Sequence, residues 1–534
     1  MYKKILLIAL ALISTRLEAQ VTVTARFDSS TGKTISNYMF GINVFQGFDP
    51  NQAGTPGNTS YKSAMNEMNP GIIRYHSWEM LGTGKNGWLD SMHDWNANKI
   101  SNALKNSYPT VSTKMINIPS WPADKFGVNS GDTLPKNKYQ EFANWCAELV
   151  KICNLDNKAG IKYWEVLNER DDTYKNNHAE LAVIFNLCAS AMKAVDPTIK
   201  VGGPAFAQAW NSANLNAFCK GTASTLDFIT YHSYTTGNSN ETNQNIYNGA
   251  DIGWVTGTVK AAWKSYSGRT IEFFHDEYNI SYSPPDAKQT NYVSQVFDAI
   301  AMISLINSGA SGAMAWNECD GWYGKMDNSY HKRPSFYLFK NFNTHLIGNQ
   351  VFNTQVSDPK KVVALTSKND SSYFVTIVNR ADVDLNINLL LKGLPLSVTS
   401  QTRVTNFENL KSGGISSNTT TLGELTSSGF ISKAGTIALL EIPKDSPTGF
   451  NSQEFNLTPA IQLFPNPAGN LVFIKIPDSF NGYEISIKDI CGRLMNHLSI
   501  QESQYLDISN YSSGIYFLEY VMNGKHRQQK FLKF

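Results

Sequence analysis

Short apolar runs alternate with longer amphipathic stretches along residues 37–345. Apolar residues recur at three-and-four spacing over residues 139–153, 179–195 and 292–305, which predicts helices there. The short runs have the length and the β-branched or aromatic content of buried strands. They lie at residues 39–44, 71–75, 113–118, 161–167, 199–203, 226–231, 271–274 and 312–316. Such a repeat of buried strand and helix is typical of a (β/α)₈ barrel.

An open, doubly wound α/β sheet would show the same alternation of strand and helix. The number of strands favours the closed barrel, and so do the polar residues that end several of them. Functional side chains in a barrel sit at the carboxyl ends of the strands. We therefore predict an α/β fold with a TIM barrel over residues 37–345.

The helical pattern stops after the barrel region, and short alternating runs replace it. Residues 385–389 alternate between apolar side chains and asparagine, as in a half-buried strand. Similar runs, separated by turn residues, occur at 362–366, 373–379, 385–391, 402–406 and 436–442. This pattern predicts a β-sandwich over residues 346–444, either alone or with an added strand from residues 21–35.

Both ends of the chain have their own character. Residues 1–20 combine Lys3 and Lys4 with a short apolar stretch and a cleavage region, so we expect an export signal peptide. Residues 445–460 are polar and predict a linker, and residues 461–534 predict a small all-β domain. No later segment reaches the ~20 apolar residues of a spanning helix, so we expect no integral membrane segment after signal removal.

Composition excludes some classes of function. The formal net charge of the 534 residues is +2, and no lysine or arginine stripe is present, which argues against a nucleic-acid partner. The six cysteines are scattered and form no metal-ligand spacing. We interpret them as buried or incidental thiols, with one disulfide between distant partners left open. We expect neither a metal nor an organic cofactor.

Two glutamates follow buried strands at opposing parts of the predicted rim. Glu169 follows the fourth barrel strand and Glu277 follows the seventh. Two carboxyl groups facing each other suit glycosidic bond cleavage, in which one donates a proton and the other attacks or stabilises the anomeric carbon. A separation of about 5–5.5 Å would indicate retention of configuration, and about 6.5–9.5 Å inversion.

The motifs Asn168-Glu169, the glutamate at 277 and Trp316 after the eighth strand together resemble glycoside hydrolase clan A. Within the clan the chain is most similar to family 39, of the β-xylosidase and α-iduronidase type, with family 51 or family 30 as the next alternative. The resemblance implies a retaining mechanism, with Glu169 as acid/base and Glu277 as nucleophile. It also implies substrate-pocket roles for five further residues: Asn168, Arg74, His232, Tyr234 and Trp316.

Several neighbouring residues depart from this pattern or offer alternatives to it. Arg170 stands where the clan commonly has proline after the glutamate. Glu165 and Glu272 fall too early on their strands for the catalytic roles, and Asp276 points away from the mouth if its strand is regular. Three loop tryptophans, which either stack outer sugars or cap the barrel, are Trp78, Trp121 and Trp322.

The C-terminal segment resembles the sorting domain of the type IX secretion system. Four ordered motifs carry the resemblance, at residues 463–468, 487–493, 506–509 and 513–517, followed by a basic end. The resemblance implies passage through the outer membrane by the type IX machinery, with the mature protein secreted or at the cell surface. A small carbohydrate-binding module is the alternative.

These observations lead to one expected function and two alternatives. We expect a secreted retaining hydrolase whose partner is a carbohydrate substrate, a plant or algal polysaccharide. Its mechanism requires a raised pKa of Glu169 in the free enzyme, caused by the pocket and by the charge of Glu277. The alternatives are a catalytically silent glycan-binding protein on the same barrel and a transglycosylase that uses the same residues.

Overall fold

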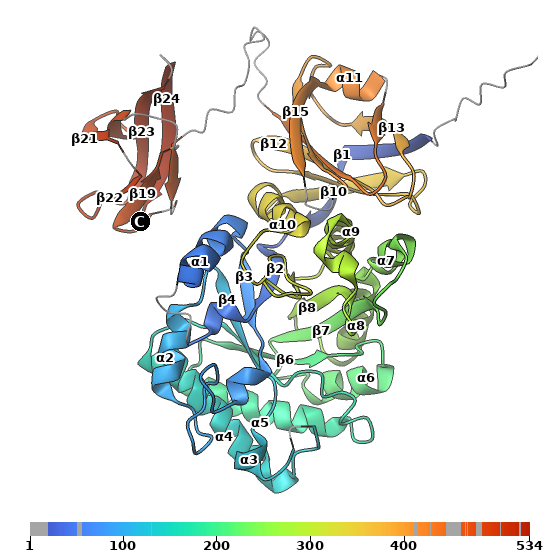
Figure 1. Cartoon of the computed structure of the whole chain (residues 1–534), viewed down its shortest axis with the longest axis vertical. Coiled ribbons are helices and arrows are strands. Elements are labelled where there is room, and N and C mark those ends of the chain that lie inside the picture. The colour runs from blue at the N-terminus through green and yellow to red at the C-terminus, as the bar shows by residue number, and fades with distance from the viewer. Residues whose placement is uncertain are drawn as a thin grey trace, which may run out of the picture. The chain divides into compact units, whose positions relative to one another are not determined.

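The computed structural model describes residues 20–50, 56–129, 131–410, 414–427, 429–444, 461–464, 466, 468–476, 483–501, 503–522 and 525–534. The chain divides into two compact units, Met1–Ser446 and Pro447–Phe534 (Figure 1). The predicted linker and nearly all of the predicted signal peptide lie outside the described residues.

A closed parallel barrel forms most of the first unit, which confirms the predicted fold class. Its strands are β2 (Tyr38–Val44), β3 (Ile72–Tyr75), β4 (Thr113–Ile118), β5 (Tyr163–Val166), β6 (Lys200–Phe206), β7 (Phe228–Thr236), β8 (Glu272–Ser281) and β9 (Gly312–Ala315). Helices surround the barrel (Figure 1): α1 (Pro56–Met68), α2 (Ala97–Lys105), α3 (Ala123–Phe126), α4 (Tyr139–Val150), α5 (Ala179–Val195), α6 (Ser212–Gly221), α7 (Asn243–Gly249), α8 (Gly253–Tyr266), α9 (Tyr292–Ser308) and α10 (Pro334–His345).

The barrel interior has an apolar layer at the amino ends of the strands. Six fully buried side chains form this floor: Ile72, Met115, Tyr163, Phe228, Phe274 and Met314. Two residues further along these strands, the side chains include the polar Arg74 on β3 and Glu165 on β5, and both are completely buried. The polar layer therefore lies above an apolar floor, in surroundings that strengthen electrostatic interactions.

Strand β8 contains an irregularity that matters for the site. Its pairing with β7 runs from Tyr231 opposite His275 directly to His232 opposite Glu277, so that Asp276 is an extra residue. The pairing of β8 with β9 shows a register shift over the same stretch. A β-bulge of this kind changes the direction in which neighbouring side chains point.

The remaining strands of the first unit form one nine-stranded sheet, in the order β15-β14-β17-β12-β11-β10-β1-β13-β16. They are β1 (Gln20–Thr34), β10 (Gln350–Val356), β11 (Val362–Lys368), β12 (Ser372–Asn379), β13 (Leu385–Lys392), β14 (Gln401–Phe407), β15 (Ile415–Thr421), β16 (Phe430–Ser432) and β17 (Ile437–Pro443), with helix α11 (Leu422–Ser427) after β15. Side chains of β12 and β13, which are distant in the sheet order, share one apolar cluster. The sheet therefore folds over on itself around a core, and the N-terminal strand β1 pairs with both β10 and β13.

The second unit is all-β, as predicted. It contains a three-stranded sheet of β18 (Gln462–Phe464), β19 (Leu471–Lys475) and β22 (Gln504–Asp507). A four-stranded sheet consists of β20 (Tyr483–Asp489), β21 (Leu494–Ile500), β23 (Gly514–Met522) and β24 (Lys525–Lys533). Ile485, Leu518 and Phe531 lie in its buried core.

Two further features concern the chain as a whole. All six cysteines are free thiols, five of them buried and Cys491 exposed. Among the described residues, none of the helices combines the length and the apolar character needed to cross a bilayer.

Candidate active site

The mouth of the barrel carries the predicted residues, and the loop after β5 positions the first of them. Leu167 and Glu169 have backbone φ angles of 70° and 54°, in the left-handed region that side chains rarely adopt. Hydrogen bonds from the N–H of Leu167 to Ile118 and from the N–H of Glu169 to Ala205 hold this conformation. The Glu169 side chain remains 41% exposed, so it faces the solvent-filled mouth.

Glu277 lies inside β8 and not at its end, because β8 extends to Ser281. Its side chain is only 9% exposed, and its Oε2 atom lies 3.3 Å from Nη1 of Arg74. The preceding residue was expected to point away from the site. That expectation is wrong, because the bulge in β8 turns Asp276 toward Arg74, with Oδ2 3.0 Å from Nε.

Arg74 is the central cation of the polar layer. Its Nη1 donates to Asn43 at 2.8 Å, and its Nη2 donates to Asn168 at 2.8 Å. Its Nε donates to Oε2 of Glu165 at 2.8 Å. Arginine suits this position because its planar donors can serve several acceptors at once. Arg74 thus ties the nucleophile candidate Glu277 to the amide of Asn168.

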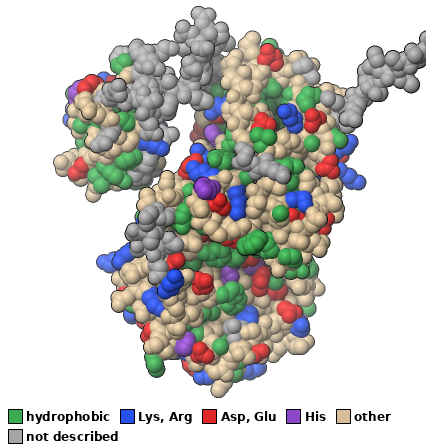
Figure 2. Space-filling model, viewed as in Figure 1, with side chains coloured by type: hydrophobic (Ala, Val, Ile, Leu, Met, Phe, Trp, Pro, Cys, Tyr) green, Lys and Arg blue, Asp and Glu red, His purple; other side chains and the backbone are tan. Residues whose placement is uncertain are grey.

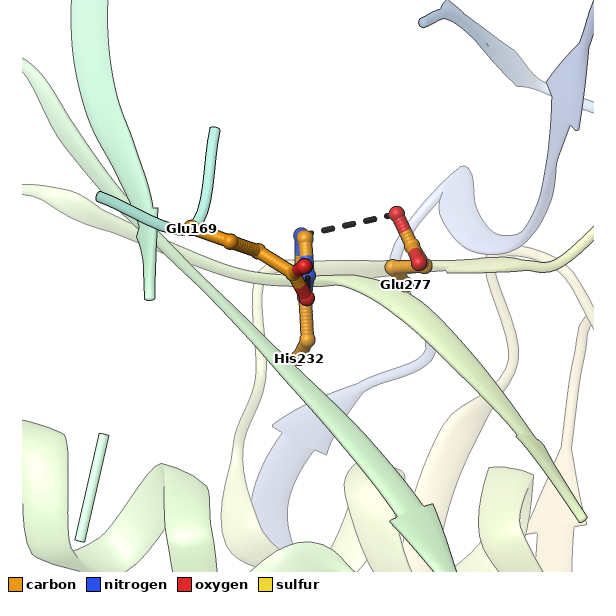
Figure 3. Close-up of side chains that lie close together, drawn as sticks. All are labelled: Glu169, His232 and Glu277. Atoms are coloured by element: carbon orange, nitrogen blue, oxygen red, sulfur yellow. Dashed lines mark hydrogen bonds and ion pairs between the residues drawn. The ribbon is translucent and has the colours of Figure 1, made fainter. Parts of the chain in front are cut away.

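His232 lies between the two predicted catalytic carboxyl groups (Figure 3). Its Nδ1 lies 2.8 Å from Oε1 of Glu169, and its Nε2 lies 3.7 Å from Oε2 of Glu277. Burial opposes the charged imidazolium, but Glu277, Asp276 and Glu169 outweigh it and raise the pKa of His232 to about 9. The histidine therefore carries a proton at neutral pH.

The pKa of Glu169 differs from the sequence-based expectation. Desolvation would raise it, but the hydrogen bond from His232 and the positive charges of His232 and Arg74 together lower the pKa of Glu169 below its ordinary value. The expectation of a raised pKa in the free protein was therefore wrong. The physical reason is that the neighbouring histidine holds the proton that the carboxyl group was expected to hold.

Glu277 has a second hydrogen-bond donor, the hydroxyl of Tyr234, which lies 2.5 Å from its Oε1. Burial and the charge of Glu277 raise the pKa of Tyr234 well above its ordinary value, so the phenol stays protonated. One oxygen of Glu277 thus faces Tyr234 while the other faces Arg74. Both contacts fix the position of the Glu277 carboxyl group.

Trp316 follows β9 and forms an aromatic wall beside these groups. It packs edge-on against Phe45, with ring centroids 4.8 Å apart, and lies 5.6 Å from the ring of His76. Asn279 donates a hydrogen bond to its carbonyl oxygen. Hydrophobic side chains cross the middle of the barrel face, with histidine and acidic side chains beside them (Figure 2).

One nitrogen of His232 and one oxygen each of Glu169 and Glu277 lie within 4.8 Å of one another. A metal ion could in principle use three such ligand atoms, but it would require a neutral histidine. The surrounding carboxylates favour the protonated imidazole instead. The residues therefore fit a proton-sharing group better than a metal centre.

Sequence reasoning missed several polar residues of the buried layer. Asn117 donates to Oε2 of Glu165 at 2.7 Å and lies 2.8 Å from the Nδ1 atom of His76. Asn43 contacts both Arg74 and the carbonyl of Asp276. A usable signal was present, since Asn43 and Asn117 each stand between two β-branched apolar residues of a buried strand. Glu165 was set aside as too early on its strand, yet it is a direct partner of Arg74.

The three loop tryptophans differ in how deeply they are buried. Trp121 is fully buried beside Arg170, whose guanidinium lies 5.1 Å from its ring, so it caps the barrel. Trp78 and Trp322 are 49% and 65% exposed. Glu272 is remote from the mouth, because it begins β8 and pairs with Lys200.

Comparison with known proteins agrees with this geometry. Residues 125–384 match the model of the glycosyl hydrolases family 39. Residues 462–533 match the model of the secretion system C-terminal sorting domain. Both resemblances found in the sequence are therefore confirmed. The family 39 match includes Glu169, His232 and Glu277, and it begins after the strands that carry Asn43 and Arg74.

A β-xylosidase from Caldicellulosiruptor saccharolyticus is 23% identical over 293 residues, which are 49% of this chain and 59% of that protein. The chain thus spans somewhat over half the length of this relative. Among solved structures, the family 39 enzyme from Xanthomonas axonopodis pv. citri has a TM-score of 0.58 at 14% identity, covering 81% of this chain and 99% of that one. A family 51 α-L-arabinofuranosidase from Bifidobacterium longum has a TM-score of 0.60 at 15% identity, covering 79% and 99%. At these identities, the two structures establish the fold.

Proposed function

We propose that the protein is a retaining glycoside hydrolase that acts on plant or algal polysaccharides or oligosaccharides. The observation that carries the proposal is the spacing of Glu169 and Glu277, which offer oxygens within 4.8 Å of each other across His232. Retaining enzymes hold their two carboxyl groups about 5–5.5 Å apart, whereas inverting enzymes need about 6.5–9.5 Å for an intervening water.

In the first step Glu277 attacks the anomeric carbon. The contacts from Arg74 and Tyr234 hold its carboxyl group in place for this attack. The bond between the anomeric carbon and the glycosidic oxygen breaks, and that oxygen takes a proton from Glu169. The product of this step is a glycosyl ester on Glu277 and a free leaving alcohol.

The proton for this step comes from His232. A bound sugar displaces water from the exposed Glu169 carboxylate, and loss of water favours the neutral acid. The proton then moves from Nδ1 of His232 to Oε1 of Glu169 across 2.8 Å and onward to the leaving oxygen. In the second step Glu169 removes a proton from water, the hydroxide attacks the anomeric carbon, and the ester bond to Glu277 breaks.

Two further residues position the sugar in this proposal. Arg74 fixes the amide of Asn168 through its Oδ1 atom, so the Nδ2 group is available to donate to the hydroxyl beside the anomeric carbon. The indole of Trp316 provides a flat apolar surface for the ring, beside His76. The C-terminal unit would direct export through the type IX machinery, and the mature enzyme would act outside the cell.

The test uses the full chain, a variant of the proposed nucleophile and a matched control variant on the same strand. Parent, Glu277→Gln and Glu272→Gln proteins are incubated with a panel of polysaccharides and aryl glycosides, and new reducing ends are measured. We expect Glu277→Gln to lose at least ~10³-fold in kcat, whereas Glu272→Gln, at the other end of β8, retains parent activity. Equal activity of Glu277→Gln and parent would refute the nucleophile assignment. Binding without turnover by the parent would favour the silent glycan-binding alternative.

A further inference from the structure

Three buried carboxyl groups surround the single guanidinium of Arg74. Glu165, Asp276 and Glu277 all lie within 3.3 Å of its nitrogens. Arg74, Glu165 and Asp276 have no exposed side-chain surface. One cation facing three ionised carboxylates would leave a large uncompensated charge in an apolar interior, which is strongly unfavourable.

The hydrogen-bond donors are distributed unequally among these groups. Oε2 of Glu165 receives Nε–H of Arg74 at 2.8 Å and Nδ2 of Asn117 at 2.7 Å. Asp276 lies 3.0 Å from the same Nε, but that N–H points to Glu165. Both oxygens of Asp276, and Oε1 of Glu165, are buried with no hydrogen-bond partner. A proton on Asp276 that is donated to Oε1 of Glu165 would give a hydrogen-bond partner to that oxygen and to one oxygen of Asp276.

Charged and titratable groups face Asp276 from the other barrel strands. Arg74 projects from β3 and Glu165 from β5, while Tyr231 and His232 project from β7. Nε2 of His232 lies 3.6 Å from Oδ1 of Asp276. Glu277 is the neighbour on β8 itself, and Asn43 on β2 binds the backbone carbonyl of Asp276. The two cations among these groups already have Glu165, Glu277 and Glu169 as anionic partners.

We propose that Asp276 is held as a neutral carboxylic acid that donates a hydrogen bond to Glu165, and that it thereby leaves the charges of Arg74 and His232 to Glu165, Glu277 and Glu169. Asp276 is then a positioning residue that acts through Arg74. Burial and the charge of Glu165 support this state, since both raise the pKa of Asp276 well above its ordinary value. The bulge in β8 is what brings Asp276 to this position.

The protonation state has a direct spectroscopic test that is independent of activity. In an infrared difference spectrum of parent minus Asp276→Asn at neutral pH, we expect a carboxylic-acid C=O band that shifts in heavy water. The matched control is Glu272→Gln, because Glu272 begins the same strand and is ion-paired with Lys200. That control should show only carboxylate bands. Carboxylate bands alone in the Asp276→Asn difference would overturn the proposal.

The positioning role rests on the proposed function and has a separate test. Asparagine keeps a neutral, planar donor, so Asp276→Asn should retain kcat within about threefold of the parent. Valine offers no donor to Glu165, so Asp276→Val should lose kcat by ~10²-fold through displacement of Arg74. If asparagine and valine impair kcat equally, the positioning role is refuted even where the infrared band is present. If the parent itself has no activity, the proposed function fails while the infrared result stands.

Discussion

Nδ1 of His232 lies 2.8 Å from Oε1 of Glu169, on the opposite side of the imidazole from Glu277. The histidine therefore couples the exposed carboxylate of the mouth to the buried one. In the proposed mechanism the proton on this imidazole passes to Glu169 for the acid step. Replacement of His232 tests that coupling.

We predict that His232→Gln lowers kcat/KM by at least ~10²-fold on substrates with poor leaving groups. In the parent, activity should fall as the pH rises through about 9, because the raised pKa of His232 means that its proton is lost there. The pH profile of kcat/KM checks this. A parent profile that stays flat through this range would contradict the role of His232 as the proton source.

A leaving-group series separates the two carboxyl groups. Glu169→Ala removes the acid, so cleavage of aryl glycosides with acidic phenols should be little affected in the first step, while alkyl glycosides lose ~10³-fold. Added azide should restore turnover by attacking the glycosyl ester without need of a base. A uniform loss over all leaving groups, with no effect of azide, would argue against Glu169 as the acid/base.

Arg74 should be important for stability as well as for activity. Arg74→Met leaves buried carboxylates without their cation, and we expect the free energy of unfolding to fall by about 3–5 kcal/mol. Urea denaturation of parent and variant measures this difference. The exposed pair of Lys175 and Asp172 provides the control, since Lys175→Met should change the free energy of unfolding by less than about 1 kcal/mol.

Replacing the loop tryptophans should affect stability according to how deeply each one is buried. Trp121→Ala empties a fully buried site and should cost about 3–5 kcal/mol of unfolding free energy. Trp78→Ala and Trp322→Ala should leave stability nearly unchanged, because their side chains are half exposed or more. If these two tryptophans stack sugars, their replacement by alanine will raise KM for oligosaccharides but not for aryl glycosides. Thermal and urea unfolding, with KM measured on both substrate types, check the division.

Glu318 gives a prediction about pH and stability. Its Oε1 accepts N–H groups of Phe45 and Gln46 at 2.7 and 2.8 Å, but burial raises its pKa from 4.5 to about 8. Between pH 4.5 and about 8, Glu318 keeps its proton in the folded state and loses it in the unfolded state. The free energy of unfolding therefore falls as the pH rises through this window. Glu318→Gln removes this penalty, and its stability advantage should grow by about 1.4 kcal/mol per pH unit across that window. Urea denaturation at several pH values measures it, and an advantage independent of pH would contradict it.

Much of the barrel and its mouth was predictable from the sequence, because buried parallel strands are read as apolar runs and their ends are marked by polar residues. The strand runs that precede Glu169 and Glu277 illustrate this. The order of the strands alone predicted that Glu169 and Glu277 lie at the mouth of the barrel. Arg74 and His232 were expected at the site only through the resemblance to clan A, and the structure has them on β3 and β7.

The pairing register and the protonation states were not predictable in this way. The bulge at Asp276 depends on how β7 and β9 pair with β8, which no local pattern in the β8 segment encodes. The lowered pKa of Glu169 depends on the position of His232, which is distant in sequence. Glu165 was undervalued for a similar reason, since its importance comes from a contact with Arg74 across the barrel.

The apolar floor formed by Ile72, Phe228, Met314 and their neighbours has a consequence for how turnovers follow one another. It insulates the charged groups from bulk solvent on one side. In the proposed mechanism a bound sugar would close the other side, so that the reaction would use the protons already enclosed. The water that ends one catalytic cycle would then return a proton to His232 for the next.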